Sequence, residues 1–385
     1  MFELLALLLP VAAASGWFAA TRNSRRVHES YVSGSPSTKT SKFRGLNYRL
    51  SEESTGKPEN STYLGGEAAE SQIALGNLFR RNGEVERAIN IHQDLITESS
   101  LSEEQHGQAL FELGMDYLRA GLFDRAEQIF AELLDDSLYG ESATQQLLQI
   151  YQHEKEWHKA IKCTKKLKQI GKIKRGESIA HFYCELAENA LKANLLESAK
   201  QYVNEAEIAD QYCVRTSLVL ADIQIYQGLY QEALDSLQRV EDQNPEYILE
   251  IIAPMMECYK YLGNISEQID RFSRLYHCHP ILGISEVLVG LLRERDGLDA
   301  AVSFFSDQAK RDPTLRGLHN LINLRLDQTQ GSGKKLLQEL GSISSALLKE
   351  KPAYSCTQCG FSGAQLHWRC PSCHHWETIK SKKCE

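Results

Sequence analysis

Proline is scarce in this sequence, and positive charge is in the minority. Nine prolines stand among 385 residues, and so few helix-breaking residues suit a chain built mostly of helices. Lysine and arginine number 43 against 51 aspartates and glutamates, a formal net charge of -8. Because phosphate binding needs a basic face, this balance argues against a general role in binding nucleic acid. Apolar residues make up 42% of the chain, enough for a large core.

The sequence also offers no catalytic constellation. No paired carboxylates, Ser/His/Asp set or His-rich metal helix stands out from the solvated charges of the helices. The glycine-containing segment at residues 331–335 is too short for a phosphate-binding loop and has no Ser or Thr after its lysine. We therefore predict a protein that is not an enzyme.

Residues 74–96 carry helical spacing twice, with a turn at Asn82 and Gly83 between the two halves. The apolar and small residues of this pattern are Leu75, Gly76, Phe79, Ala88, Ile89 and Leu95. Gly76 and Ala88 are small where two antiparallel helices would cross closely. The pattern is similar to a tetratricopeptide hairpin, with His92 where an aromatic residue is usual.

The small residue of the second helix recurs along the chain. The positions are Ala88, Ala126, Ala160, Ala199, Ala233, Gln268 and Ala301, at steps of 38, 34, 39, 34, 35 and 33 residues. Pro245, Pro280 and Pro313 each stand twelve residues beyond such a position, which an irregular helical bundle does not explain. We predict seven hairpins over residues 67–350, stacked into an all-α superhelix with a long concave surface. Helical patterning at residues 318–348 is expected to cap it.

Residues 1–20 form a nearly continuous apolar run, close to the roughly 20 residues that span a bilayer. Arg22, Arg25 and Arg26 follow the run, whereas a cleavable signal peptide carries its positive charges before the apolar core. By the positive-inside rule, the arginine side remains in the cytoplasm. We predict a retained transmembrane anchor, with the bulk of the chain on the cytoplasmic side.

Two alternatives to the anchor remain. The small residues at 12–15 resemble a signal-peptide cleavage site, but a secreted product would export five single thiols, and such thiols favour a reducing compartment. A buried globular helix would need an apolar partner, which the neighbouring sequence does not supply. Residues 21–66 are predicted to be a basic juxtamembrane linker with a degenerate repeat, lying on anionic lipid or forming a solvated tether.

Residues 351–385 contain two C-x2-C pairs separated by ten residues. Such a pair turns the chain so that two thiolates point at one ion, and two pairs close a tetrahedral site. The predicted ligands are Cys356, Cys359, Cys370 and Cys373. Zinc and iron both accept four thiolates, so the spacing does not choose between them. Gly360 is expected to permit the tight turn, and Tyr354, Phe361, Trp368 and Trp376 to form the small apolar shell of the module.

The order of these parts resembles the bacterial lipopolysaccharide assembly protein B family. The resemblance is carried by the amino-terminal MFELLALLLPVAAASGW, by LGNLFRRNGEVERAI and IAHFYCELA in the repeats, and by CTQCGF and HWRCPSC at the end. It implies a rubredoxin-type metal module and an inner-membrane regulator that helps the membrane AAA protease FtsH degrade LpxC, the deacetylase that commits precursor to lipid A. It also implies a membrane partner that senses lipopolysaccharide.

Two other interpretations stay open. One is a general membrane-tethered tetratricopeptide scaffold unconnected to lipid A, and the other is a rubredoxin-like electron-transfer protein. The metal module is expected to act as a rigid terminal cap docked on the repeats, rather than as a redox centre. An exposed edge of the repeats would also allow self-association into a homo-oligomer.

Overall fold

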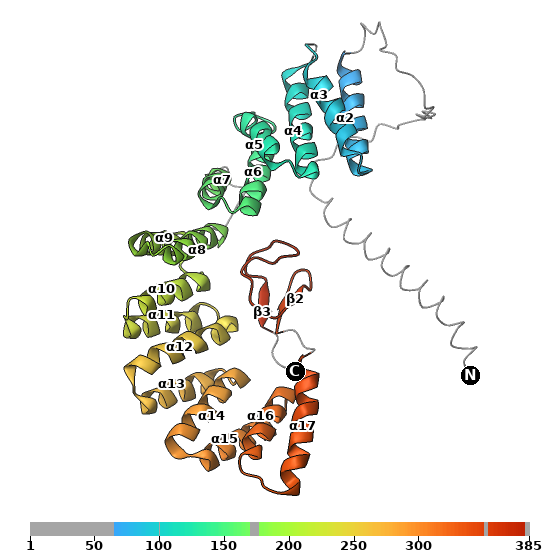
Figure 1. The fold of residues 1–385 in the computed structure, drawn as a ribbon. Helices are drawn as coiled ribbons and strands as arrows, with labels where there is room; N and C mark the ends of the chain where they lie inside the picture. The colour runs from blue at the N-terminus through green and yellow to red at the C-terminus, as the bar shows by residue number, and fades with distance from the viewer. Residues whose placement is uncertain (1–64, 100, 170–176, 350–352, 382–385) are drawn as a thin grey trace, which may run out of the picture. The chain divides into compact units, whose positions relative to one another are not determined.

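The computed structural model describes residues 65–99, 101–169, 177–349 and 353–381, and the described residues up to 349 are mostly helical (Figure 1). The helices follow one another as pairs joined by short turns, and neighbouring pairs pack on one another in chain order. The pairs are α2 (Gly65–Arg81) with α3 (Val85–Ile96), α4 (Glu103–Ala120) with α5 (Phe123–Glu132), α6 (Gly140–Glu154) with α7 (Trp157–Gln169), α8 (Glu177–Lys192) with α9 (Leu196–Ala209), α10 (Val214–Tyr226) with α11 (Tyr230–Gln243), α12 (Ile248–Leu262) with α13 (Ile265–Cys278), α14 (Leu282–Asp296) with α15 (Leu298–Arg311), and α16 (Leu315–Leu326) with α17 (Ser332–Lys349). The predicted all-α repeat fold is confirmed.

The seven recurring positions each lie in the second helix of a hairpin. All six alanines are fully buried, and Gln268 is buried as well. A close crossing also explains the glycines of the first helices. A Cβ atom on Gly114 would lie 2.7 Å from Cε1 of Phe130, and one on Gly76 would lie 2.4 Å from Nε2 of His92. The spacing seen in the sequence is therefore a steric requirement of the crossing.

His92 fills the place of the usual aromatic side chain, and it carries a polar contact. Its Nδ1 lies 2.6 Å from Asp116 Oδ2 in the next hairpin, and Arg80 donates a hydrogen bond of 2.8 Å to Asp116 Oδ1. His92 and Asp116 are both buried. A buried carboxylate needs such partners, so this network ties the first hairpin to the second.

The segment expected to cap the superhelix forms a further hairpin, α16 with α17. A terminal repeat usually turns a polar face to water. Here α17 exposes apolar side chains at helical spacing, namely Leu336, Leu340, Ile343 and Leu347. The outer face of this last hairpin is therefore more apolar than that of an ordinary cap.

A small antiparallel sheet follows the helices. Its strands are β1 (Tyr354–Cys356), β2 (Ser362–Gly363) and β3 (Ile379–Ser381), in the order β2-β1-β3. Ser355 pairs with Ser362 on one side and with Lys380 on the other. The buried residues of this module are Cys356, Cys370 and Ile379.

Among the residues that the structure describes, no helix has the length and apolar character needed to cross a membrane. The predicted anchor at residues 1–20 lies outside those residues. So does nearly all of the predicted linker with its degenerate repeat, since the described chain begins at residue 65.

Candidate metal centre

The two C-x2-C pairs adopt the same backbone hydrogen-bond pattern. In the first, the Cys356 N–H donates to the Phe361 carbonyl at 2.7 Å, and the Gly360 N–H donates to the Cys356 carbonyl at 3.0 Å. In the second, the Cys370 N–H donates to the His375 carbonyl at 2.9 Å, and the His374 N–H donates to the Cys370 carbonyl at 2.9 Å. The two turns are therefore equivalent knuckles.

Each knuckle has a residue in the left-handed region at the same position, four after its first cysteine. Gly360 has φ 77° and His374 has φ 61°. Glycine adopts this conformation freely, whereas a residue with a Cβ atom pays roughly 1–2 kcal/mol for it. The predicted role of Gly360 is confirmed, and the second knuckle reaches the same turn with a less suitable residue.

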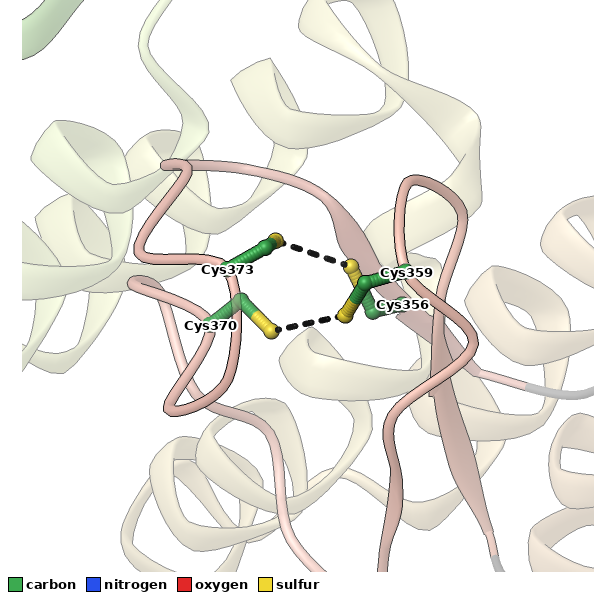
Figure 2. Close-up of side chains that lie close together, drawn as sticks. All are labelled: Cys356, Cys359, Cys370 and Cys373. Atoms are coloured by element: carbon green, nitrogen blue, oxygen red, sulfur yellow. Dashed lines mark hydrogen bonds between the residues drawn. The ribbon is translucent and has the colours of Figure 1, made fainter. Parts of the chain in front are cut away.

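The knuckles bring the four predicted ligands together (Figure 2). Cys356 Sγ lies 3.7 Å from Cys373 Sγ, and Cys359 Sγ lies 3.6 Å from Cys370 Sγ. All four sulfurs lie within 4.8 Å of one another. Bonds of about 2.3 Å to a tetrahedral ion would separate the sulfurs by roughly 3.8 Å. The arrangement is a rubredoxin-like metal-binding site, and its residues fit a four-thiolate ion.

The four thiols differ in acidity. Burial acts to raise the pKa of Cys356, but hydrogen bonds with Thr378 and with the backbone at Cys359 and Gln358 lower that pKa to about 6. Burial and the neighbouring sulfurs raise the pKa of Cys373 to about 12. Four thiolates at these distances repel one another, so a bound cation is what would allow all of them to lose their protons. Soft thiolates suit zinc or iron, and the geometry accepts either.

The nearby histidines stand outside this sulfur cluster. His367, His374 and His375 are exposed, and the predicted shell of four cysteines does not include them. Cys384 lies outside the described residues. Of the thiols in the repeats, Cys163, Cys184, Cys213 and Cys258 are buried as expected, whereas Cys278 is exposed.

The two tryptophans of the module pack outward onto the repeats rather than forming its own apolar shell. Trp376 stacks on His181 of α8, with ring centroids 4.8 Å apart, and meets Trp157 and Phe182 edge-on. Trp368 lies beside Tyr247, with centroids 5.2 Å apart. Only Tyr354 and Phe361 of the four predicted aromatics pack against the buried residues of the module. That part of the prediction is corrected, because the repeats supply a larger apolar partner.

Polar contacts complete the attachment. Tyr354 donates a hydrogen bond of 2.8 Å to Glu250 of α12, and Lys380 lies 3.0 Å from Glu246 in the 3-10 turn η1 (Pro245–Tyr247). Arg369 donates to the Gln152 carbonyl of α6 at 3.2 Å. The module therefore docks on helices from α6 to α12, in the middle of the repeats, and the expectation of a terminal cap is wrong.

Sequence-family models match two parts of the chain. One described as a rubredoxin metal binding domain matches residues 354–381. Another described as a tetratricopeptide repeat matches residues 73–143. The first match spans both knuckles and all three strands. The second covers the whole second hairpin and parts of the first and third.

Curated relatives align with the chain from end to end. The lipopolysaccharide assembly protein B of Escherichia coli (strain K12) is 37% identical over 99% of this chain and 98% of its own length. The protein of that name from Haemophilus influenzae is 34% identical over the same shares. Among solved structures, a tetratricopeptide repeat protein from Parabacteroides merdae covers 73% of this chain and 100% of its own at 13% identity. Its TM-score is 0.32, so the fold assignment depends on the helix pairs themselves.

Proposed function

Because the chain belongs to the lipopolysaccharide assembly protein B family, we propose that it is a non-catalytic adaptor in lipopolysaccharide assembly. The observation that carries the proposal is the alignment with relatives of that name over 99% of this chain and 98% of theirs, at 34% to 37% identity. Repeats and metal module both fall within the aligned length.

The adaptor would present the deacetylase LpxC to the membrane protease FtsH and so limit the supply of lipid A. Stacked hairpins suit this task, since they offer an extended surface to a protein partner and need no chemistry of their own. A membrane partner that senses lipopolysaccharide would adjust the activity of the adaptor. The interactions with FtsH, with LpxC and with this membrane partner are all parts of the proposal.

A membrane anchor at residues 1–20 would position the adaptor beside its protease on the cytoplasmic side of the inner membrane. Confining two proteins to one membrane raises their effective concentration without any new contact. Removing residues 1–20 should therefore leave folded repeats that no longer regulate. Full regulation by the truncated chain in the cytosol would show that the anchor is dispensable.

The metal module has a structural role in this proposal. When bound, zinc or iron would hold Cys356, Cys359, Cys370 and Cys373 as thiolates, and such an ion contributes roughly 10–16 kcal/mol to the folding of a small domain. The folded module then packs Trp376 and Trp368 onto the middle hairpins. The ion would thus set the conformation of the repeat surface, and no electron transfer is required.

The test is the lifetime of LpxC in cells that lack this gene and in cells that regain it. Deletion should lengthen the half-life of LpxC, and the full chain should restore it. An unchanged half-life would favour a scaffold unconnected to lipid A. If only iron-loaded and not zinc-loaded protein restored turnover, an electron-transfer role would replace the adaptor.

A further inference from the structure

Three side chains of types that commonly bind metals lie close together where the module docks on the repeats. They are His181 on α8, Cys213 immediately before α10, and Glu377 between the second knuckle and β3. One ligand atom from each lies within 4.8 Å of the other two. We propose that these residues form a second metal site, separate from the four-thiolate centre, that takes Zn²⁺ or a similar divalent transition metal.

His181 provides the strongest reason to expect a ligand. Its imidazole is fully buried. Nδ1 has no hydrogen-bond partner among the described residues, and Nε2 faces only the carboxylate of Glu377. Trp376 stacks on the ring, and Trp368 lies near it with centroids 6.0 Å apart. A buried polar group without a partner is costly and calls for an explanation such as a bound ion. A neutral imidazole nitrogen is a common metal ligand.

Glu377 approaches this imidazole from the module. Its Oε1 lies 3.2 Å from His181 Nε2. Burial acts to raise the pKa of Glu377, but this contact with His181 lowers that pKa below its ordinary value. Glu377 has φ 55°, and its backbone is held by the N–H donating to the Trp368 carbonyl at 2.8 Å and by the Tyr247 hydroxyl donating to its carbonyl at 3.3 Å. The chain thus keeps a strained residue that brings a carboxylate to the buried ring.

Cys213 supplies a thiol on the repeat side. It is buried, and the hydrogen bond from Cys184 lowers the pKa of Cys213 in spite of burial. Thiolates are the form in which cysteine binds metals. One thiolate and one carboxylate balance the two charges of the ion. The nearby Arg215 is paired through Nη2 with Glu185 and Glu188, at 2.8 and 2.7 Å.

The distances suit a tetrahedral ion with three protein ligands and one water. Zinc bonds of about 2.0 Å to nitrogen or oxygen and about 2.3 Å to sulfur place ligand atoms roughly 3.3–3.8 Å apart. The His181–Glu377 distance of 3.2 Å is already close to that range, and Cys213 lies within 4.8 Å of both. Side-chain movements of about 1 Å would complete the site.

Such a site would make docking depend on metal. Its ligands come from the fourth hairpin, from the start of the fifth and from the module, so one ion would hold three segments that are distant in sequence. Cys356, Cys359, Cys370 and Cys373 would hold the ion that stabilises the folded module, and His181, Cys213 and Glu377 would hold the ion that fastens this module to the repeats.

The test counts metal ions on the full-length chain purified in detergent. Metal-free protein is reloaded anaerobically with excess Zn²⁺ or Co²⁺ and desalted, and bound metal per chain is measured by mass spectrometry. Wild type should hold two ions, and Cys213→Ser and Glu377→Gln should each hold one. Cys258→Ser, which changes a buried thiol of α12, is the matched control and should hold two.

Visible spectra of the Co²⁺ protein separate the two sites. The intense sulfur-to-cobalt bands of the four-thiolate centre should persist in Cys213→Ser and Glu377→Gln, which shows that both variants are folded. One ion on wild type would overturn the proposal and leave His181 and Glu377 as a simple ion pair. Two ions on both variants, or loss of the four-thiolate bands together with the second ion in both, would also overturn it.

Discussion

The indole of Trp376 lies almost flat on the imidazole of His181, with ring centroids 4.8 Å apart and an interplanar angle of 13°. One ring belongs to the cysteine module and the other to the fourth hairpin. Trp376 also donates a hydrogen bond from Nε1 to Gln152 Oε1 at 3.3 Å. This single side chain therefore reaches α6, α7 and α8, and it is the main apolar anchor of the docked module.

Trp376→Ala should release the module from the repeats. Truncating a packed tryptophan costs roughly 3–5 kcal/mol of stability. Because Trp376 packs on the repeats, the variant should weaken docking of the module more than it weakens the sulfur cluster. Hydrogen exchange should show faster exchange of amides in β3 and at the start of α8, and a chelator should remove metal faster. The control is Tyr261→Ala, which breaks the exposed stack with Tyr230. It should change neither the amide exchange nor the rate of metal removal. Unaltered exchange in β3 of the Trp376 variant would contradict the anchor role.

Cys356→Ser should unfold the module, because three thiolates and a hydroxyl bind the ion far more weakly than four thiolates. The expected results are loss of the four-thiolate Co²⁺ bands and of the near-ultraviolet circular dichroism of the module, and Cys373→Ser should behave alike. Cys278→Ser is the control, since Cys278 is exposed and far from the cluster in sequence. Retention of those bands by either cluster variant would exclude the four-thiolate assignment.

The helix hairpins and the cysteine knuckles could be predicted from the sequence alone. Helix crossings need a small residue at fixed spacing, so Ala126 or Ala160 identifies a hairpin without any knowledge of its neighbours. Likewise, Cys356 and Cys359 define a knuckle by their spacing alone. Both kinds of prediction depend on residues a few positions apart, and the structure agrees with both.

The docking of the module could not be predicted in the same way. His181 stands at an ordinary helical position, and nothing near it in the sequence points to Trp376 or Glu377. Tryptophans in a module this small were expected to cover its own ion. They face the repeats because a sulfur cluster with Ile379 and Phe361 already fills the inside. Contacts between segments so distant follow from the stacking of whole hairpins, not from local spacing.

Gly114→Ala should destabilise the repeats, since the new Cβ would lie 2.7 Å from the Phe130 ring. Overpacking of this kind costs about 1–3 kcal/mol. Gly290→Ala is the matched change, because a Cβ on Gly290 of α14 meets no atom within 4 Å among the described residues. The free energy of unfolding of this variant should rise by roughly 0.5–1 kcal/mol, because alanine has a better helix propensity than glycine. Thermal unfolding of the two variants should shift in opposite directions, and equal shifts would contradict the steric account.

Glu250→Gln should strengthen docking at neutral pH. Burial raises the pKa of Glu250 above its ordinary value of 4.5, although the hydrogen bond from Tyr354 acts against this. In the window between 4.5 and the raised pKa, the docked state holds a proton that the undocked carboxyl has lost. Docking therefore weakens as pH rises through this window, and it stays weaker above it.

The glutamine variant is neutral at every pH, and its amide oxygen can still accept from Tyr354. Its docking should match that of wild type near about pH 4 and exceed it near about pH 7, by the linkage between proton binding and stability. Hydrogen exchange of β3 amides, corrected for the intrinsic effect of pH, measures the difference. Weaker docking of the Glu250→Gln variant than of wild type at neutral pH would contradict this prediction. It would show that the charged carboxylate of Glu250 stabilises the docked state.

The central claim is that this chain delivers one protein to another and performs no chemistry itself. The most direct measurement is the rate at which purified FtsH degrades purified LpxC in one reconstituted membrane, with and without the full-length chain. The account predicts faster degradation when the wild-type chain is present, and no acceleration by the Cys356→Ser variant. An equal rate with and without the wild-type chain would contradict it.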